Sequence, residues 1–455
     1  MRHRYRLISC IAALVLAAAC KDKTLRLGAG GSSDQTWSPA TLTSVAGVPE
    51  AQVESALRAR LAGPRPAHID EHKWGHIHRL YKIYGNNPLW LAPDGLHKER
   101  AFALTNAVAD AANDALRMDA YPISELATSI AQLKQTSKPT ADQLAEADVL
   151  LSSAYVSLGV DYINGQVDPK SVSQNWHIDR HEENEDSALV RAIRNPAIDK
   201  AIATLRPADS DYADLQKALA DYRSLVAKGG WGSVPEGKPV KPGEADNPAR
   251  LSALRARLAA EGITVAASTE QAPAPGDSSK KRASHRSPRS GAATFDHSLA
   301  GAVAAFQARH GIAVDSMLGP ETVKSMNIPA TYRVGQIAAN MERFRWLPRN
   351  FPSRYVYVNV PEFRLEAYDS GQKVLEMKVI VGQDFEDKAT PVFADSMESV
   401  VFRPYWNVPP TIAAKEIFPK ISSGYLAAND METYQEGGQT RIRQRSTRLR
   451  HTPAS

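Results

Sequence analysis

The sequence predicts a multidomain protein in which two α-helical regions precede a β-rich region. From about His68 to Leu225, apolar residues recur every three or four positions, as in amphipathic helices. After Arg354 the period changes to two, as in strands. A length of 455 residues favours about three domains. A composition of 43% hydrophobic and 23% charged residues is ordinary for globular domains.

Residues 1–20 are expected to be a lipoprotein signal peptide. A basic start precedes an apolar run from Leu7 to Ala19, which is too short to span a bilayer comfortably and ends in Ala-Ala-Ala-Cys. We expect lipidation of Cys20, with ordinary cleavage near an Ala-x-Ala site as the alternative. The lipid would hold the protein to an envelope membrane in the periplasm. Cys10 is the only other cysteine, so the mature chain would form no internal disulfide.

The net charge gives no argument for nucleic-acid binding. The formal charge of +5 falls to +2 once Arg2, Arg4 and Arg6 of the leader are left out. A basic stretch within residues 265–291 is Pro- and Ser-rich, which is typical of a disordered insertion. We therefore expect no nucleic-acid partner.

Residues 21–66 are expected to be a linker with one short helical pattern, AQVESALRARLAG. Residues 67–243 are expected to form a helical domain, because stretches such as ADQLAEADVLLSSAYVSLGVDYI repeat the helical spacing. Gly229, Gly230 and Gly232 end its last helix, and a proline-containing loop follows.

Residues 247–330 are expected to form a small helical module that carries the insertion 265–291. NPARLSALRARLAAEG predicts its first helix, and Leu299, Val303 and Phe306 line one face of the next. Gly311 is expected to end that helix, and Pro320 suits the first position of another. Asn327 can cap the end of that last helix.

A bridge over residues 331–353 leads to the β-rich region 354–438. Tyr355, Tyr357 and Asn359 alternate with valines, and Asp369-Ser370-Gly371 predicts a hairpin turn into KVLEMKVIVG. Residues 400–402 (VVF) suggest a further strand. Residues 439–455 form a basic tail with no clear apolar pattern.

The chain resembles the large periplasmic murein L,D-transpeptidases from about residue 68 to about residue 436. LYKIYGNNPLW, SLGVDYINGQVDP and YRSLVAKGGWGSVPEG resemble the helical scaffold domain of that family. The small module resembles its peptidoglycan-binding-like domain, and NMERFRWLP its bridge. VYVNVPEFRLEAY, KVIVG, TPVF and FRPYWNVPPTI resemble the front part of its mostly-β catalytic domain.

This resemblance implies acyl transfer on peptidoglycan. In the family, a cysteine thiolate attacks the carbonyl after the third residue of a peptide stem and expels the terminal D-alanine. A histidine handles the proton, backbone N–H groups hold the oxyanion, and an amine from a second stem resolves the thioester. The implied partners are peptidoglycan peptide stems and glycan, and no cofactor or metal is implied.

The cysteine of that mechanism is missing from this sequence. The family carries it in a Ser-His-Gly-Cys-x-Arg motif, but no cysteine follows Cys20 here. The expectation is a catalytic domain cut off before its nucleophile, by a frameshift or a premature stop, and inactive as written. His451 in the tail lies in a stretch similar to one near the family motif, with the spacing off by one. The alternative is a non-catalytic peptidoglycan-binding lipoprotein.

Other residues suggest binding sites. Tyr405, Trp406 and Asn407 in FRPYWNVPP are candidates for a substrate groove, with core packing as the alternative. His68, His72 and His76, with His78 nearby, have a spacing that could bind zinc on one helix, but helix surfaces often carry histidine and we expect no metal. Phe306, Gln307 and His310 could touch glycan, although core packing is the commoner use of such a phenylalanine.

Overall fold

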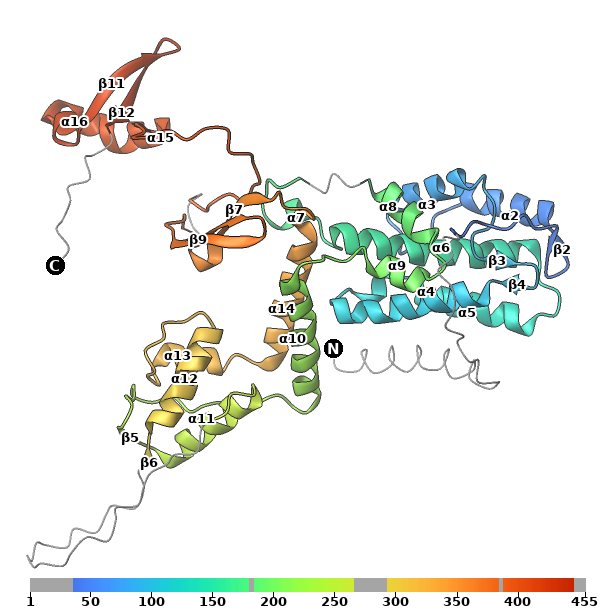
Figure 1. Ribbon diagram of the computed structural model, residues 1–455, viewed down its shortest axis with the longest axis horizontal. Helices are drawn as coiled ribbons and strands as arrows, with labels where there is room; N and C mark the ends of the chain where they lie inside the picture. Colours follow the sequence, from blue (N-terminus) through green and yellow to red (C-terminus); the bar gives the residue numbers. More distant parts are fainter. Residues whose placement is uncertain (1–35, 180–183, 266–292, 384–387, 446–455) are drawn as a thin grey trace, which may run out of the picture. The chain divides into compact units, whose positions relative to one another are not determined.

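The chain divides into two units in a computed structural model that describes residues 36–179, 184–265, 293–383 and 388–445 (Figure 1). The first unit ends at Val392 and the second begins at Phe393. Cys20, His451 and nearly all of the expected insertion 265–291 lie outside the described residues. Among the described helices, none combines the length and apolar character that crossing a bilayer would need.

Helix α6 (Ala141–Asn164) is the central element of the first helical domain. The hydroxyl of Thr140 accepts from the Gln143 backbone N–H, and the Gln143 side chain accepts from the backbone N–H of Thr140, which starts the helix with a capping box. Nearly every side chain after Leu144 is buried, as expected for a helix that is apolar on most sides.

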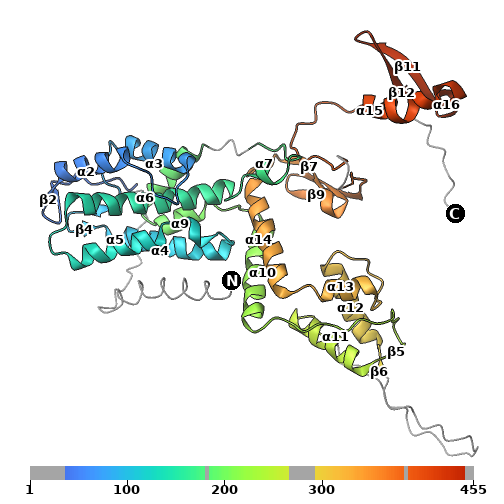
Figure 2. The same cartoon turned by 180° about the vertical axis from the view of Figure 1, so that it is seen from behind.

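Six further helices build this domain around α6 (Figures 1 and 2). Five pack on α6 directly, and α9 packs against α4 and α8. They are α2 (Glu50–Ala62), α3 (Glu71–Ile83), α4 (Lys98–Asp110), α5 (Ile123–Gln135), α8 (Glu185–Ile193) and α9 (Ile198–Ala203). Their short connections contain η1 (Ala111–Asp114), η2 (Met118–Ala120), α7 (Pro169–Val172) and the two-residue pairs β1 (Ser44–Val45) with β2 (Val48–Pro49) and β3 (Leu91–Ala92) with β4 (Gly95–Leu96).

Helix α2 corrects the expectation of a linker over residues 21–66. Its Val53, Ala56, Leu57 and Leu61 are buried, and α2 packs along α6. These positions follow the three-and-four spacing of a helix with one apolar face, so burial of that face stabilises the segment. The described C-terminal half of the expected linker is therefore part of the helical core.

The carboxylate of Asp114 is a buried junction at the end of η1. Its Oδ1 accepts from the hydroxyl of Tyr212 (2.9 Å) and from Gln216 (2.6 Å). Its Oδ2 accepts from Arg206 Nε (2.8 Å) and from the hydroxyl of Tyr162 (3.1 Å). The four donors come from α6, from α10 (Ser210–Ala227) and from the loop before α10. Together they use the acceptor positions of an ionised carboxylate, which offsets the cost of burying its charge.

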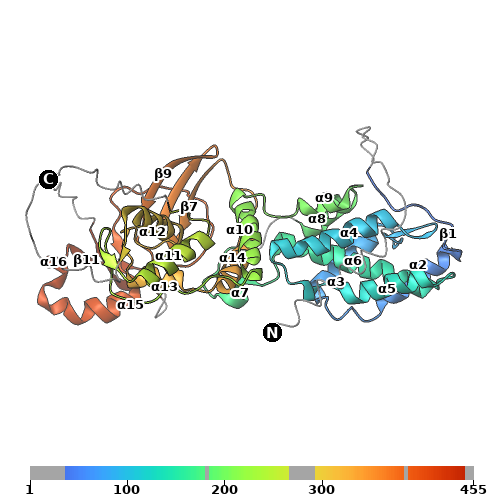
Figure 3. The same ribbon diagram turned by 90° about the horizontal axis from the view of Figure 1, so that it is seen from below.

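Helix α14 (Ala330–Trp346) lies beside α10 and joins the same junction (Figure 3). The guanidinium of Arg345 is buried and donates to the Asp114 carbonyl and to the Tyr212 hydroxyl. Glu342 accepts from the backbone N–H groups of Gln166 (2.6 Å) and Val167 (2.8 Å), just after α6 ends. The segment expected as a bridge is thus mainly one helix, fixed to the helical domain by buried polar contacts.

The small helical module contains α11 (Pro248–Ala260), α12 (His297–Arg309) and α13 (Pro320–Met326). The predicted signals are confirmed: Pro320 is the first residue of α13, Asn327 is its C-cap, and α12 ends two residues before Gly311, whose φ is 65°. The Asn327 side chain also binds both backbone groups of Val234. A short pair, β5 (Ala245–Asp246) with β6 (Ala293–Thr294), and a core that includes Leu254 complete the module.

Arg257 and Glu261 form a buried ion pair inside this module. Arg257 donates to Glu261 (2.8 Å) and to the Met326 carbonyl (2.7 Å), and its guanidinium lies 3.6 Å from the ring centre of Trp231. Glu261 also lies 3.0 Å from His310 Nε2. Burial by itself would raise the pKa of Glu261, but the hydrogen bond with His310 and the charge of Arg257 lower it to about 2.

The β-rich region begins with a three-stranded antiparallel sheet of β7 (Arg354–Asn359), β8 (Arg364–Asp369) and β9 (Gln372–Lys378). The one-turn helix η3 (Val360–Glu362) joins β7 to β8. The predicted hairpin is confirmed, with Ser370 and Gly371 at φ of 52° and 77°, the left-handed pair of a type I′ turn. Apolar side chains of the sheet, including Val356, Val374 and Met377, are about half exposed.

The second unit contains an antiparallel sheet in the order β10 (Trp406–Asn407), β12 (Gln439–Gln444) and β11 (Met431–Glu436). Its short helices are α15 (Pro410–Ile412), η4 (Ala413–Ile417), η5 (Phe418–Ser423) and α16 (Tyr425–Ala428), and Ile417 and Ile442 lie in its core. Two expectations are wrong here. Residues 400–402 form no strand and are 67–87% exposed, because no neighbouring strand pairs with them. The start of the expected basic tail is strand β12, which buries Ile442.

Replacing Asp114 by asparagine is expected to destabilise the helical domain. Arg206 would lose the carboxylate that it pairs with, and the amide nitrogen of asparagine would face other hydrogen-bond donors. We expect the free energy of unfolding to fall by about 3–5 kcal/mol. Urea unfolding followed by far-UV circular dichroism measures the change in midpoint. Asp119→Asn is the matched control, because Asp119 is exposed in the neighbouring η2, and it is expected to stay within about 0.5 kcal/mol. Equal midpoints for the two variants would contradict a structural role for the Asp114 junction.

The Glu261 carboxylate predicts an acid-sensitive module. Its pKa is lower in the folded protein than its ordinary value of 4.5, so its stabilisation is fully present above about pH 4.5 and is lost as pH falls toward about 2. Hydrogen exchange of α11 and α12 at pH 6 and pH 3 measures this loss. In Glu261→Gln, the amides of α11 and α12 are expected to be less protected from exchange already at pH 6. The further loss of protection between pH 6 and pH 3 is expected to be smaller than in the unaltered protein. Glu321→Gln, at an exposed position, is the control and should behave as the unaltered protein. An equal pH response of Glu261→Gln and the unaltered protein would show that the acid sensitivity does not come from Glu261.

Candidate functional site

Tyr405, Trp406 and Asn407 lie at the edge strand of the second unit. Trp406 pairs with Gln444 and Asn407 with Arg443 in the β10–β12 ladder. Tyr405 and Trp406 are 47% and 45% exposed, so neither side chain belongs to the core of this unit. Side chains alternate along a strand, and Trp406 and Asn407 therefore point to opposite faces. The three residues do not form one continuous surface, and their role as a groove stays a prediction.

Tyr405 instead contacts residues that sequence reasoning missed. The guanidinium of Arg443 lies 4.3 Å from the ring centre of Tyr405 and 5.0 Å from that of Tyr434. Glu432 binds both Arg443 (2.7 Å) and Arg445 (2.6 Å). Hydrogen bonds from Arg445 and Arg443 lower the pKa of Glu432. The alternation of Arg441, Ile442 and Arg443 is the strand signal that could have placed these residues in a sheet.

The side of the sheet that carries Arg443 offers the rings of Tyr405 and Tyr434 beside fixed charges, whereas Trp406, which pairs with Gln444, lies on the other side. Half-exposed Trp406 can stack on a planar or apolar ligand group, because an exposed ring still gains from covering its face. Arg443 already has its carboxylate partner in Glu432, so it supplies a rigid edge. The arrangement can hold a planar or apolar ligand group by stacking. Within the described residues, it contains no nucleophile beside a general base.

The histidines near the start of α3 separate into different environments. Asp70 caps the helix and Glu71 is its first residue, so His68 lies before the helix, where it contacts Glu125. His78 makes an edge contact with Trp74. His68 therefore does not lie on the helix on which the i, i+4, i+8 spacing could have placed all three histidines.

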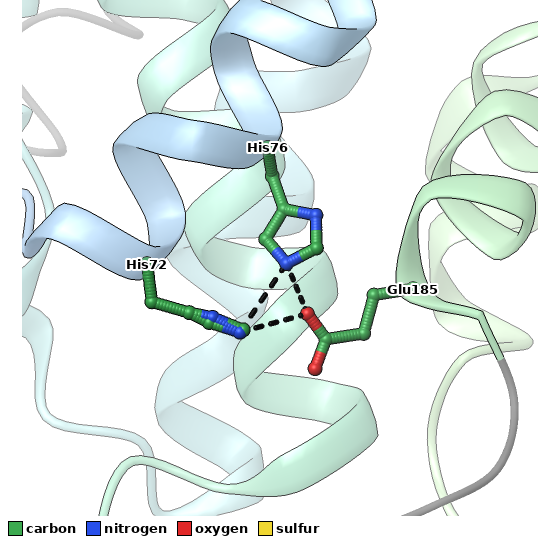
Figure 4. A group of neighbouring side chains, drawn as sticks. All are labelled: His72, His76 and Glu185. Carbon is green, nitrogen blue, oxygen red and sulfur yellow. Dashed lines mark hydrogen bonds and ion pairs between the residues drawn. The ribbon is translucent and has the colours of Figure 1, made fainter.

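His72 and His76 converge with Glu185 from α8 (Figure 4). Their Nε2 atoms lie 3.3 Å apart, and Glu185 Oε2 lies 3.2 Å from His72 Nε2 and in closer contact with His76 Nε2. Burial opposes the charged form of His76, but hydrogen bonds and charges of Glu185 and Asp186 raise its pKa. Of the described residues, these three are a group that could hold a metal ion.

The glycan-binding alternative for the small module has no exposed side chains to support it. Phe306 is fully buried in the core. Gln307 is 1% exposed and holds the loop at Asp315 through two hydrogen bonds. His310 faces Glu261. The core interpretation of Phe306 is therefore confirmed.

Comparison with known proteins identifies two parts of the chain. A scaffold-domain family model matches residues 75–219, and an L,D-transpeptidase catalytic-domain model matches residues 353–448. A putative L,D-transpeptidase of Haemophilus influenzae is 33% identical over 88 residues, which cover 19% of this chain and 17% of that relative. The chain therefore matches less than a fifth of the length of this curated relative.

The two family models agree with the fold. The scaffold match falls on the helices around α6, and the catalytic-domain match covers the sheets from β7 to β12. The predicted multidomain architecture, with a helical N-terminal region and a small-sheet C-terminal domain, is confirmed. The remaining domain boundaries stay predictions. The chain therefore contains one region similar to a scaffold domain and one similar to an L,D-transpeptidase catalytic domain.

Proposed function

We propose that this chain is a periplasmic protein, anchored by lipid on Cys20, that binds peptidoglycan peptide stems through its catalytic-domain region. The observation that carries this proposal is the catalytic-domain match over residues 353–448. The leader with its apolar run before Cys20 supports export and anchoring. The half-exposed Trp406 is the side chain we assign to stem binding.

The reaction of the family requires a thiolate. Its sulfur attacks the carbonyl after the third stem residue, the amide bond to the terminal D-alanine breaks, and the expelled amine takes a proton from a histidine. The amine of a second stem then attacks the thioester carbonyl, which forms the cross-link and returns the thiolate. Backbone N–H groups stabilise the oxyanion in both steps. Each step depends on a sulfur atom within the catalytic domain.

The polypeptide of this sequence supplies no such sulfur. Its two cysteines are Cys10 and Cys20, both in the leader, and the matched region 353–448 has none. A serine or threonine hydroxyl does not substitute readily, because a thiol is partly ionised near neutral pH whereas a hydroxyl is not. We infer that this polypeptide carries out no transpeptidation by itself.

A second candidate function is peptidoglycan binding by the helical part alone. The helical domain and the small module each have a continuous buried core. Arg345 of α14, the helix that follows the small module, donates a hydrogen bond to the carbonyl of Asp114 in the helical domain. In contrast, apolar residues of the β7–β9 sheet are about half exposed. In this alternative, removing Trp406 has no effect on binding.

Incubation with tetrapeptide stems tests the proposed inactivity. The purified mature chain is expected to form no cross-linked dimer and no carbapenem adduct, because no thiolate is present to be acylated. Mass spectrometry of the stems and of the intact protein measures both. An L,D-transpeptidase that carries the Ser-His-Gly-Cys motif is the positive control. Appearance of a cross-linked product or of a protein adduct overturns the inference.

Co-sedimentation with purified peptidoglycan tests the role of Trp406. Trp406→Ala is expected to weaken binding of the full-length protein about 5–30-fold, the usual effect of removing a binding tryptophan. Phe393→Ala is the matched control, because Phe393 is another exposed aromatic residue of the same unit and is expected to leave binding unchanged. Unchanged binding by Trp406→Ala would favour the helical part as the binding surface.

A further inference from the structure

A small cluster in the helical domain has the geometry of a metal site. The Nε2 atoms of His72 and His76 lie 3.3 Å apart, and Glu185 Oε2 lies 3.2 Å from the first of them and in contact with the second. A tetrahedral ion with bonds of about 2.0–2.1 Å to its ligands separates neighbouring ligand atoms by about 3.3 Å. The nitrogen–nitrogen distance and the His72–Glu185 distance therefore match the edges of such a tetrahedron.

The helices bring these side chains together from distant parts of the sequence. His72 and His76 are one turn apart on α3, so their rings lie on the same face, with ring centres 4.6 Å apart. Glu185 is the first residue of α8, which packs against α3 (Figure 4). His76 is 5% exposed, whereas the His72 side chain is 43% exposed. The cluster is thus closed on its inner side and accessible to an ion on its outer side.

Neighbouring residues orient two of the three groups. His76 Nδ1 lies 2.6 Å from Asp186 Oδ1 and 2.8 Å from Arg79 Nη2. The carboxylate is the closer group, and a proton on Nδ1 donated to it leaves the Nε2 lone pair directed at the cluster. Asp186 is held in turn by Arg79 Nε at 2.6 Å. A carboxylate behind the distal nitrogen is the usual support of a metal-binding histidine.

The surroundings of the Glu185 carboxylate also support a bound cation. Its Oε1 accepts a hydrogen bond from the Asn164 side chain, which fixes the direction of the carboxylate. Its Oε2 is buried, and the atoms that face it are the two imidazole nitrogens. A buried carboxylate is costly unless a cation neutralises its charge.

We propose that His72, His76 and Glu185 bind one zinc ion that joins α3 to α8. Two imidazole nitrogens and one carboxylate oxygen form a ligand set that zinc accepts, and the absence of thiolate and the single carboxylate disfavour copper(I) and calcium respectively. Three protein ligands leave a fourth position for water on the side of exposed His72. Glu185, the ligand nearest in sequence to the catalytic-domain match, lies 168 residues before its first residue, 353, and the occupancy of the site does not depend on the function proposed above.

The alternative is a cluster held by protons alone. His76 in its charged form would pair with Glu185 and Asp186 as an ion-pair network without a metal. The two cases differ in stoichiometric metal binding and in the role of His72. A proton network needs no contribution from half-exposed His72, whereas a zinc site loses one ligand without it.

Metal titration of the full-length protein distinguishes the two cases. Untagged protein is treated with a chelator, desalted, and titrated with zinc chloride by calorimetry, and cobalt(II) absorption reports tetrahedral geometry. We expect one zinc per chain. His72→Gln and Glu185→Gln should each weaken binding at least about 100-fold, since losing a residue that merely supports a ligand already costs about 10–100-fold. His68→Gln and His78→Gln are matched controls and should bind as the unaltered protein, because neither lies in the cluster.

Hydrogen exchange adds a readout that is independent of affinity. Zinc should slow amide exchange in α3 and α8 of the unaltered protein and of both controls, but not of His72→Gln. Circular dichroism without zinc checks that His72→Gln keeps its helices, as expected for a half-exposed side chain. Absence of stoichiometric zinc binding overturns the proposal. Zinc binding that survives both His72→Gln and Glu185→Gln, or that falls equally in His78→Gln, overturns it as well.

Discussion

The arrangement of the helical part depends on the buried carboxylate of Asp114. A charge without exposure to water is tolerated only when its acceptor positions are filled, and here the donors come from α6, α10 and the loop between α9 and α10. Arg345 from α14 adds a contact to the backbone of the same residue. These donors meet only when all the elements are in place. The carboxylate therefore specifies one arrangement of helices that apolar packing alone would leave less defined.

Binding and catalysis make separate demands on an L,D-transpeptidase catalytic domain. The proposed stem binding needs a surface of fixed shape, and in the β10–β12–β11 sheet Arg443 is held between Tyr405 and Glu432. Acyl transfer needs a thiolate in addition, and the region 353–448 has none. The helices of the scaffold region contribute in another way. Their buried polar contacts serve to hold α14, the helix that precedes the first strand of the β-rich region.

Signals local to the chain were readable from sequence, whereas signals that depend on a distant partner were not. Caps and turns located α13 at Pro320 and the hairpin at Gly371, because backbone geometry there is set by the residues themselves. The apolar residues 400–402 suggested a strand that has no neighbour to pair with. Strand β12 was missed because its arginines hid the alternation around Ile442. Glu185 was missed because only the packing of α8 on α3 brings it to His76.

The position of α6 in the chain has a consequence for biosynthesis. Helices α2 to α5 are translated before α6, but α8 and α9, which close the remaining side of the core, are translated after it. Until the ribosome has passed Ile202, a 24-residue helix that is apolar on most of its circumference has an uncovered flank. Unfinished chains of this length therefore expose apolar surface of α6, and the two short helices are the last to cover it.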